Sequence, residues 1–369
     1  MLDPVLQGEI CGEAGQVCQS DGSCTCDATS CPACTTCGGD GACAGCANCC
    51  DGSGVCQDGV TNQACGSSGT CDVCSGQEIC QDQQCVCIPI TQCPVELACG
   101  TISDGCGGQL TCGECANPTP VCTQHVCVPC EQSAQCASRE ICDGGSCAAC
   151  DVCADGCTFT SVQAAIEATS PQLTRIRICP GAYAENARSD AAIIIDHDDL
   201  TLIGAGDGGD PNTSTILRPS ASDQAVIRVD QADTIRLEGL RVTGGFGDGG
   251  SGVLLFTARV TLARCTIVGN EAVGSGGGVS ALNNSVLDIF DTMIIDNSST
   301  SPGGGIQAEF SIVTLDMNSR VNFNGAPGAG GIYAMLSSIT LPSVDNVTNN
   351  RQIDCAGVAF EGPGAVCAE

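Results

Sequence analysis

From residue 225 onward, small and aliphatic residues recur with a period of 26 or 27 residues. A small residue followed by an aliphatic one stands at Ala225-Val226, Gly252-Val253, Gly278-Val279, Gly305-Ile306 and Gly331-Ile332. After each of the last four steps, another aliphatic residue follows seven positions later, at Val260, Val286, Val313 and Ile339. A repeat of this length is typical of a solenoid, in which each unit buries its apolar face against the next. The pattern predicts an internal aliphatic stack formed by these four residues.

An asparagine recurs in the same register, ten or eleven residues after each of these aliphatic positions. The four residues are Asn270, Asn297, Asn324 and Asn350. Stacked side-chain amides can bond to one another and to the backbone of a neighbouring turn. We therefore predict that the asparagines form a structural ladder rather than a ligand site.

The segment before the repeat predicts one helix and several strands. Residues 158–172 place Val162, Ala165 and Ile166 on one helical face, and Ser170-Pro171 ends that pattern. Apolar residues then predict strands at 175–179, 191–195 and 200–203.

Residues 159–206 contain three extended motifs. They read Phe159-x-Ser161-Val162-Gln163-x-Ala165-Ile166, Ile176-x-Ile178-x-Pro180-Gly181-x-Tyr183-x-Glu185 and Leu200-x-Leu202-Ile203-Gly204-x-Gly206. This segment resembles the opening of right-handed parallel β-helix proteins, of which pectin methylesterases are familiar members. The resemblance implies that the helix caps the first coil and shields its strand edges. The catalytic motifs of those enzymes have no counterpart here, so no catalytic residue is carried over.

The glycine-rich steps of the later repeats carry a second resemblance. Gly276-Gly-Gly-Val279 follows Asn270, Gly303-Gly-Gly-Ile306 follows Asn297, and Gly330-Gly331-Ile332 follows Val321-Asn-Phe-Asn324. This arrangement is similar to the GGxI and FxxN pattern of polymorphic outer-membrane-type bacterial surface repeats, which implies adhesion or surface display. We expect an all-β, right-handed parallel β-helix with three short strands per coil and glycines at crowded corners.

Cysteine divides the chain at residue 157. Residues 1–157 contain 32 of the 36 cysteines, and the other four lie in residues 158–369. A loose repeat, C-x4–5-C-x1–2-C, often has aspartate and glycine between its first two cysteines, which predicts small hairpins. We therefore expect residues 1–157 to be a disulfide-stapled stalk with little secondary structure, and residues 158–369 to be the β-helix domain.

Several CxxC steps, such as Cys31/Cys34 and Cys112/Cys115, also have the spacing of zinc ligands. Their overlap within one segment differs from the two-plus-two pattern of a zinc ribbon, so disulfides are preferred over zinc or redox chemistry. Dense disulfides indicate an extracellular or cell-surface location. The start, Met1-Leu2-Asp3-Pro4, does not have the form of a signal peptide, so we expect a leader peptide to be absent from this sequence.

The four cysteines of the β-helix domain are expected to differ in their bonding. Cys355 and Cys367 are expected to form a disulfide that closes the last coil. Cys179 is a candidate partner for Cys157, which would tie the stalk to the first coil. Cys265 aligns with the turn residues Asp291 and Asn318 of later coils and is expected to be a free or buried thiol.

The net charge is −30, with 42 acidic and 12 basic residues. Nucleic acid and anionic membranes would repel so acidic a chain, and no run approaches the ~20 apolar residues of a membrane span. We expect no nucleic-acid partner and no membrane insertion. With seven Phe, two Tyr and no Trp, the core is expected to be aliphatic, without a flat aromatic platform.

Acidic residues gather at two points before the repeat. Asp196, Asp198 and Asp199 share one turn with His197, and Asp207 and Asp210 flank two glycines. Carboxylates are the ligands that calcium prefers, so calcium binding is the alternative to solvated turns at both points. No residue is identified as catalytic or as binding an organic cofactor.

These observations favour a secreted or cell-surface structural protein of adhesion type. Its partner is expected to be an extracellular protein or a glycan. The alternative is a carbohydrate-active enzyme on the same fold, either a polysaccharide lyase or a pectinesterase-like hydrolase, although fold alone is weak evidence for activity.

Overall fold

The computed structural model describes residues 17–18, 24–25, 35–37, 43–45, 49–51, 56–58, 60–68, 70–168, 174–188, 190–247, 249–357 and 360–362. Its contacts divide the chain into two compact units. The first contains Met1–Cys115 and Cys122–Val126, and the second contains Ala116–Val121 and Cys127–Glu369. The contacts therefore group the cysteine-rich residues 127–157 with the β-helix, whereas cysteine density alone suggests a boundary at residue 157.

The cysteine-rich part is a series of two-stranded antiparallel hairpins. Their strand pairs are β1 (Val17–Cys18) and β2 (Cys24–Thr25), β3 (Thr35–Cys37) and β4 (Cys43–Gly45), β5 (Cys49–Cys50) and β6 (Cys56–Gln57), β7 (Val60–Thr61) and β8 (Ala64–Cys65), β9 (Glu78–Gln81) and β10 (Gln84–Cys87), β11 (Thr101–Ser103) and β12 (Gln109–Thr111), β13 (Val121–Thr123) and β14 (Val126–Val128), and β15 (Glu140–Asp143) and β16 (Ser146–Ala149). The short 3-10 helix η1 (Ser133–Gln135) precedes the last hairpin. These hairpins confirm the prediction from the cysteine repeat.

Disulfides in this part interleave. In the last module Cys130 bonds to Cys142 and Cys136 bonds to Cys147. Because Cys142 and Cys147 face each other across the hairpin, the two bonds tie both of its strands to the segment before it. The same interleaving recurs in Cys65–Cys80 with Cys74–Cys85 and in Cys87–Cys106 with Cys93–Cys112.

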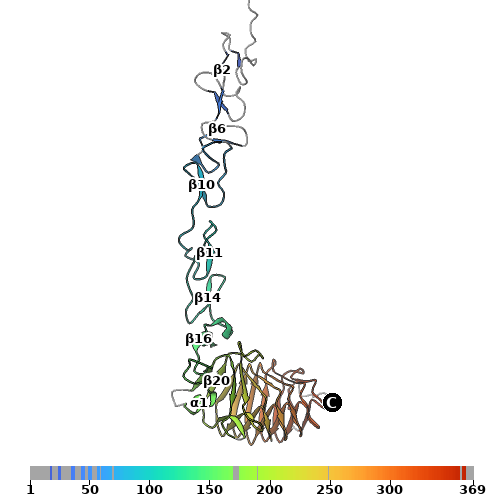
Figure 1. Ribbon diagram of the computed structural model, residues 1–369. Helices are drawn as coiled ribbons and strands as arrows, with labels where there is room; N and C mark the ends of the chain where they lie inside the picture. The colour runs from blue at the N-terminus through green and yellow to red at the C-terminus, as the bar shows by residue number, and fades with distance from the viewer. Residues whose placement is uncertain are drawn as a thin grey trace, which may run out of the picture. The chain divides into compact units, whose positions relative to one another are not determined.

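Residues 175–361 form the parallel β-helix, whose strands stack in chain order (Figure 1). Sheet 1 contains β17 (Arg175–Ile178), β20 (Thr201–Gly204), β23 (Ile235–Glu238), β27 (Arg259–Ala263), β31 (Val286–Phe290), β35 (Ile312–Leu315), β38 (Ser338–Thr340) and β41 (Phe360–Glu361). Sheet 2 contains β18 (Gly181–Glu185), β21 (Thr215–Pro219), β24 (Leu240–Thr243), β28 (Thr266–Val268), β32 (Met293–Ile295), β36 (Arg320–Asn322) and β39 (Val347–Thr348).

Sheet 3 contains β19 (Ala191–Ile195), β22 (Ala225–Asp230), β26 (Val253–Phe256), β30 (Val279–Leu282), β34 (Ile306–Glu309), β37 (Ile332–Met335) and β40 (Cys355–Gly357). The chain passes through sheets 1, 2 and 3 in turn, which confirms three strands per coil. A short fourth sheet, β25 (Phe246–Gly247), β29 (Glu271–Ala272) and β33 (Ser298–Ser299), lies between sheets 2 and 3 in the middle coils.

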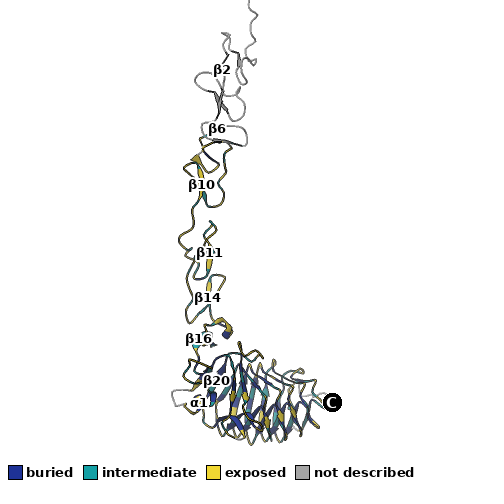
Figure 2. Cartoon of the chain, viewed as in Figure 1, coloured by how far each residue is buried: buried dark blue, intermediate teal, exposed yellow. Residues whose placement is uncertain are grey.

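The core of the β-helix is aliphatic, as predicted, and runs through its length (Figure 2). One predicted member of the internal stack is wrong. Strand register pairs Val260 with Leu287 and Leu287 with Val313, whereas Val286 pairs with Arg259 on the outer surface. Val260 and Leu287 are 27 residues apart, while the next steps are 26. Because side chains alternate between faces, this one-residue difference puts Leu287 rather than Val286 inside.

Helix α1 (Val162–Glu167) is shorter than the predicted segment, and residues 169–172 of that segment lie outside the described residues. Ser161 caps the helix by accepting a hydrogen bond from the backbone N–H of Ala164. The carboxylate of Glu185, only 5% exposed, accepts hydrogen bonds from the Val162 N–H and the Ser161 hydroxyl, both at 2.7 Å. A negative charge at this end favours the helix, so Glu185 fixes α1 to the first coil.

The last cysteine-rich module is bonded to the first coil, but not by the predicted cysteine. Cys179 pairs with Cys150, while Cys157 pairs with Cys153 four residues away. The reason is a short parallel bridge between Val152 and Ile178, which brings Cys150 alongside Cys179. Asp143 adds ion pairs to Arg175 and Arg177.

Cys355 is disulfide-bonded, and its expected partner Cys367 lies outside the described residues. Within the described part of the chain, none of the helices has the length and apolar character needed to cross a membrane.

Candidate functional site

The first group of predicted calcium ligands lies in the turn between β19 and β20. Asp198 accepts a hydrogen bond from the Asp233 backbone N–H at 2.7 Å, so it stabilises the turn of the next coil. Asp196 is 3.9 Å from an Arg188 nitrogen and 3.8 Å from His197 Nδ1. Asp199 takes a positive φ of 60°, as a turn residue of this kind readily does.

The second group consists of Asp207 and Asp210, which accept hydrogen bonds from different parts of the structure. Asp207 accepts a hydrogen bond from the Thr266 hydroxyl at 2.8 Å, two coils away. Asp210 accepts from both the backbone N–H and the side-chain amide of Asn212. Among the described residues, the acids of neither group bring three ligand atoms together; the groups that do so consist of cysteines.

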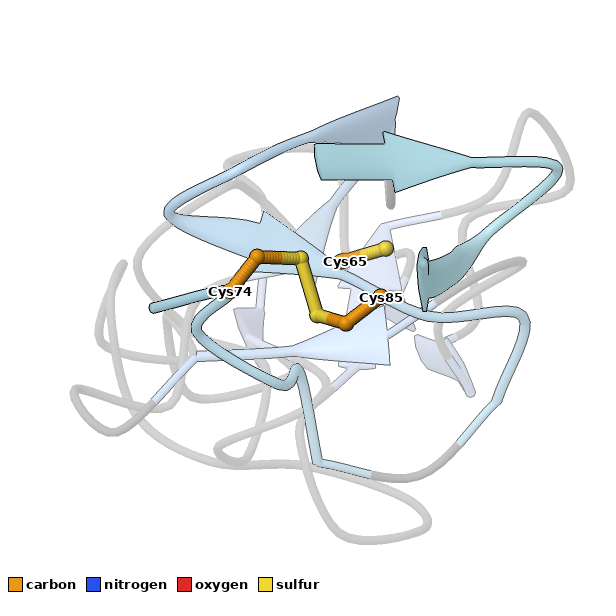
Figure 3. A group of neighbouring side chains, drawn as sticks. All are labelled: Cys65, Cys74 and Cys85. Carbon is orange, nitrogen blue, oxygen red and sulfur yellow. A yellow bond between two sulfur atoms is a disulfide. The ribbon is translucent and has the colours of Figure 1, made fainter. Parts of the chain in front are cut away.

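Those cysteine groups are pairs of adjacent disulfides. Figure 3 shows Cys65 beside the Cys74–Cys85 bond. Cys65 is itself bonded to Cys80, and the members of the other groups are also disulfide-bonded. A zinc ligand must be a thiolate, which a disulfide sulfur is not. In the described modules, disulfides therefore replace the zinc alternative.

The four repeated asparagines stack at the corner between sheets 2 and 3. Asn297 Nδ2 donates to Asn324 Oδ1 and to the Ile267 carbonyl, each at 3.0 Å. The same oxygen of Asn324 accepts the Asn297 backbone N–H at 3.0 Å. Asn270 repeats these bonds one coil earlier. Within this ladder each side chain joins two coils and replaces backbone partners lost where the chain turns.

The two ends of the asparagine ladder are closed by other residues. At the N-terminal end Asn270 Oδ1 accepts the Gly245 N–H at 2.9 Å. At the C-terminal end Asp354 Oδ1 accepts both the backbone N–H and the Nδ2 of Asn350, each at 2.9 Å. Asp354 thus takes the place of a fifth asparagine, which the sequence pattern did not indicate.

Cys265 begins a second ladder, at the corner between sheets 1 and 2. The structure confirms that it is free and buried, but it aligns with Thr292 and Ser319 rather than with Asp291 and Asn318. Thr292 Oγ1 accepts the Cys265 N–H at 3.1 Å, and Ser319 Oγ accepts the Thr292 N–H at 3.2 Å. Burial raises the pKa of the Cys265 thiol to about 12, so it is not a nucleophile at neutral pH.

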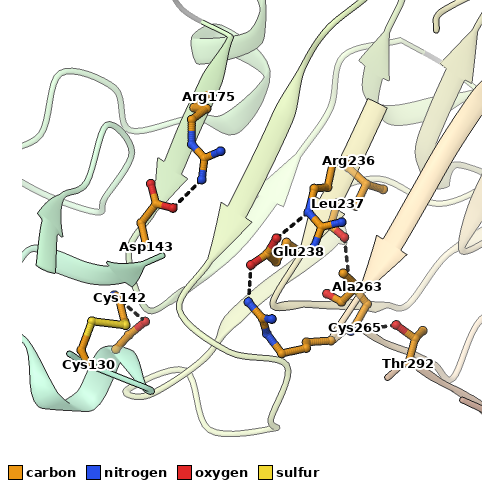
Figure 4. Close-up of polar contacts among 12 residues, drawn as sticks. Cys130, Cys142, Asp143, Arg175, Arg236, Leu237, Glu238, Ala263, Cys265 and Thr292 are labelled. Atoms are coloured by element: carbon orange, nitrogen blue, oxygen red, sulfur yellow. Dashed lines mark hydrogen bonds and ion pairs between the residues drawn. A yellow bond between two sulfur atoms is a disulfide. The ribbon is translucent and has the colours of Figure 1, made fainter. Parts of the chain in front are cut away.

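An open cleft of about 590 Å³ lies between the last cysteine-rich module and the first coils. Four glycines are among its lining residues, and Glu131, Asp207, Glu238 and Arg264 supply its charges. Glu238 forms ion pairs with both Arg236, at 2.6 Å, and Arg264 (Figure 4). The cleft therefore offers a polar ligand carboxylates and the exposed guanidinium of Arg264.

A smaller cleft of about 470 Å³ lies beside α1. Two of its polar residues, Gln163 and Tyr183, already hydrogen-bond to the backbone of the first coil. Gln163 accepts a hydrogen bond from the Ile194 N–H, and Tyr183 donates to the Cys179 carbonyl at 3.0 Å. Burial, with a contribution from Glu185, raises the pKa of Tyr183 to about 12. Tyr183 therefore stays protonated and structural.

Five of the seven phenylalanines are on the surface, and an apolar ridge follows the corner between sheets 3 and 1. Strand register stacks Phe256 on Leu282, while the Phe310 N–H donates to the Met335 carbonyl in the following coil. Phe310 is 45% exposed and Leu336 is 64% exposed. The apolar ridge consists of Phe256, Leu282, Phe310, Ile312, Met335 and Leu336.

Two members of the apolar ridge have an unfavourable backbone conformation. Phe310 and Leu336 adopt φ values of 49° and 50°. Thr257 and Asn283 occupy the same turn position in the preceding coils with φ values of 56° and 55°. The left-handed region suits glycine or asparagine, and a bulky apolar residue there is uncommon. Sequence patterns do not show this feature, because φ cannot be read from residue type.

No protein-family model matches this sequence, and no curated protein matches it. Two solved structures are similar. A pectin methylesterase from Aspergillus niger is 14% identical, with a TM-score of 0.29, covering 58% of this chain and 85% of that chain. Escherichia coli YbhC is 12% identical, with a TM-score of 0.25, covering 57% and 83%. The assignment of a parallel β-helix rests on the strand register.

Proposed function

We propose that this chain is a secreted or cell-surface structural protein of adhesion type, whose β-helix holds the apolar ridge toward an extracellular protein or glycan. The observation that carries the proposal is the apolar ridge itself, in which exposed Phe310 and Leu336 adopt the left-handed backbone conformation. Dense disulfides in the described modules support an extracellular location.

Phe310 and Leu336 contribute little to the stability of the fold. Neither side chain is buried, so neither gains much from leaving water. A left-handed backbone conformation costs an ordinary residue roughly 1–2 kcal/mol. Residues that oppose local stability without a packing gain are typical of functional surfaces. Contiguous exposed apolar residues are likewise typical of binding sites.

The chemistry of the apolar ridge favours a protein partner over a glycan. Its side chains are hydrocarbon or thioether and offer no strong hydrogen bonds to sugar hydroxyls. Glu309 lies in the ridge's own strand row, between Leu282 and Met335. Together with the net charge of −30, this favours a partner whose apolar patch is bordered by basic residues.

The test compares matched substitutions on two corners. The full chain, coupled to beads, is tested against immobilised extracellular-matrix proteins and against neutral and acidic polysaccharides. We expect the double variant Phe310→Asn, Leu336→Asn to lose capture while its melting temperature stays level or rises. Phe323→Asn is the control, since Phe323 is 54% exposed with a φ of 59° but precedes the asparagine ladder on another corner. Equal capture by the double variant and wild type would refute the role of the ridge.

The cleft favours the second candidate, a carbohydrate-active enzyme. Asp207, Glu238 and Arg264 place carboxylates and a guanidinium around one polar cavity, and such groups serve in glycan chemistry. The measurement is release of methanol from methyl-esterified pectin and of unsaturated products from polygalacturonate. Turnover that is lost in Glu238→Gln would replace the adhesion proposal with the enzymatic one.

A further inference from the structure

The β-helix domain contains four Asn-x-Ser/Thr sequences, the acceptor pattern for N-linked glycans. They begin at Asn212, Asn283, Asn297 and Asn346. Such a sequence in a disulfide-rich extracellular protein normally indicates a surface position, because the glycan is bulky and hydrated. The structure divides the four into two kinds.

Asn212 and Asn283 are exposed turn residues. Asn212 donates its side-chain amide only to Asp210, across two residues of the same turn. At these two positions a glycan on Nδ2 would extend into solvent and leave the coils intact.

Asn297 and Asn346 are buried, with 1% and 0% of their surface exposed. In both residues, the side-chain Nδ2 that would carry the glycan already donates two hydrogen bonds. Asn297 Nδ2 donates to Ile267 and Asn324, and Asn346 Nδ2 donates to the carbonyls of Asp316 and Ser319, both at 2.8 Å. A sugar on either nitrogen would remove one of these bonds and require a space that the stacked coils fill.

N-linked transfer takes place on the chain before it has folded, so the native structure cannot protect these two asparagines. A single glycan would then interrupt the asparagine ladder at Asn297, or the corner between sheets 1 and 2 two coils later, at Asn346. Buried polar groups left without hydrogen-bond partners destabilise the folded state, and the bulk of the glycan adds a steric clash. A glycosylated chain would therefore fail to close its C-terminal coils.

We propose that this chain matures in an oxidising compartment that does not attach N-linked glycans, and that glycan attachment at Asn297 or Asn346 blocks folding of the β-helix. The disulfides support the oxidising compartment, and the buried acceptor nitrogens support the absence of N-linked glycan attachment there. It holds whether the apolar ridge or the cleft is the functional surface.

The experiment uses the full chain with a leader for each of two hosts: a glycosylating eukaryotic cell and a bacterial periplasm without N-glycosyl transfer. The key variant is Ser299→Ala, Thr348→Val, which removes both buried acceptor sequences and keeps both asparagines. In the eukaryotic host we expect a several-fold higher yield of folded, protease-resistant protein from this variant than from wild type. In the periplasm we expect equal yields, which shows that the substitutions do not themselves improve folding.

A matched control removes the exposed acceptors instead. The variant Asn212→Gln, Asn283→Asp should leave the eukaryotic yield as low as that of wild type. Peptide mass spectrometry of the folded fraction should find glycans at Asn212 and Asn283 alone. A glycan on Asn297 or Asn346 in folded protein would overturn the proposal, as would equal eukaryotic yields of wild type and the key variant.

Discussion

Gly278 and Asn297 lie in adjoining coils at one crowded corner, and the position of Asn297 explains why residue 278 is a glycine. A Cβ atom on Gly278 would lie 2.9 Å from Asn297 Nδ2 and 2.6 Å from the Gly305 carbonyl oxygen. Gly252 with Asn270, Gly305 with Asn324 and Gly331 with Asn350 repeat this approach at 2.8 or 2.9 Å. The glycine and asparagine repeats in the sequence are therefore two halves of one packing arrangement.

We expect Gly278→Ala to destabilise the β-helix by about 1–3 kcal/mol, the usual range for overpacking. The blocking atoms include backbone of the next coil, which cannot move without disturbing the sheet. Urea denaturation measures the change. Gly209→Ala is the control, because a Cβ there meets nothing within 4 Å. Similar stability of the two variants would contradict the assigned packing.

Asn297→Ala should lower the free energy of unfolding by about 2–4 kcal/mol, because it removes bonds to two coils and leaves buried partners unsatisfied. Its binding to the partner of the apolar ridge should be unchanged, since the ladder lies on another corner. Thermal denaturation and the bead assay give the two readouts. Exposed Asn318→Ala should differ from wild type by no more than about 0.5 kcal/mol. Loss of binding without loss of stability would instead make the ladder a ligand site.

Asp316 should make the β-helix sensitive to acid. Burial alone would raise its pKa, but hydrogen bonds from Ser319, Asp291 and Asn318 outweigh this and lower the pKa below 3.8. Since the folded pKa lies below the unfolded value, the carboxylate stabilises the fold above the unfolded pKa, and this stability is lost as pH falls through the folded pKa. Urea midpoints at pH 7, 5 and 3 should show a decline below about pH 4. Asp316→Asn should flatten that decline, and an unchanged slope would refute the assignment.

Cys265 should resist thiol reagents in the native protein and react once the chain unfolds. Its buried thiol has a pKa of about 12, so little thiolate forms at pH 8. Cys265→Thr should change stability by less than about 1.5 kcal/mol, because Thr292 occupies the equivalent position in the next coil. Cys265→Asp should cost several kcal/mol by burying a charge. Rapid native labelling of Cys265, or equal damage from both substitutions, would contradict this account.

The fold was predictable where one residue type repeats in a fixed register. Gly278-Val279 and Asn297 have counterparts in adjacent coils, so period alone indicates a stacked, parallel arrangement. The internal stack was less predictable, because a coil can gain a residue on either side of a strand. Val286 and Leu287 are both aliphatic, and only the pairing with Val260 shows which of them faces inward.

The candidate sites were less accessible to sequence reasoning. Asp196, Asp198, Asp207 and Asp210 attract attention as acids, yet the structure assigns hydrogen bonds or ion pairs with turns and neighbouring coils to each of them. The apolar ridge consists of residues that look like ordinary core formers. Its exposure depends on which side of the strand faces out and on the sign of φ at two turns.

Composition and a repeat of 26 or 27 residues are enough to predict a disulfide-rich region followed by a parallel β-helix, since they leave few other ways to bury aliphatic side chains. Only the folded chain shows that Cys150 rather than Cys157 bonds to Cys179, that Asp354 closes the asparagine ladder, and that Phe310 and Leu336 face solvent. Each of these outcomes depends on a displacement of a few residues along the chain. Residue type does not reveal such a displacement, but the displacement decides which face of a strand a side chain occupies and which residue of the next coil it contacts.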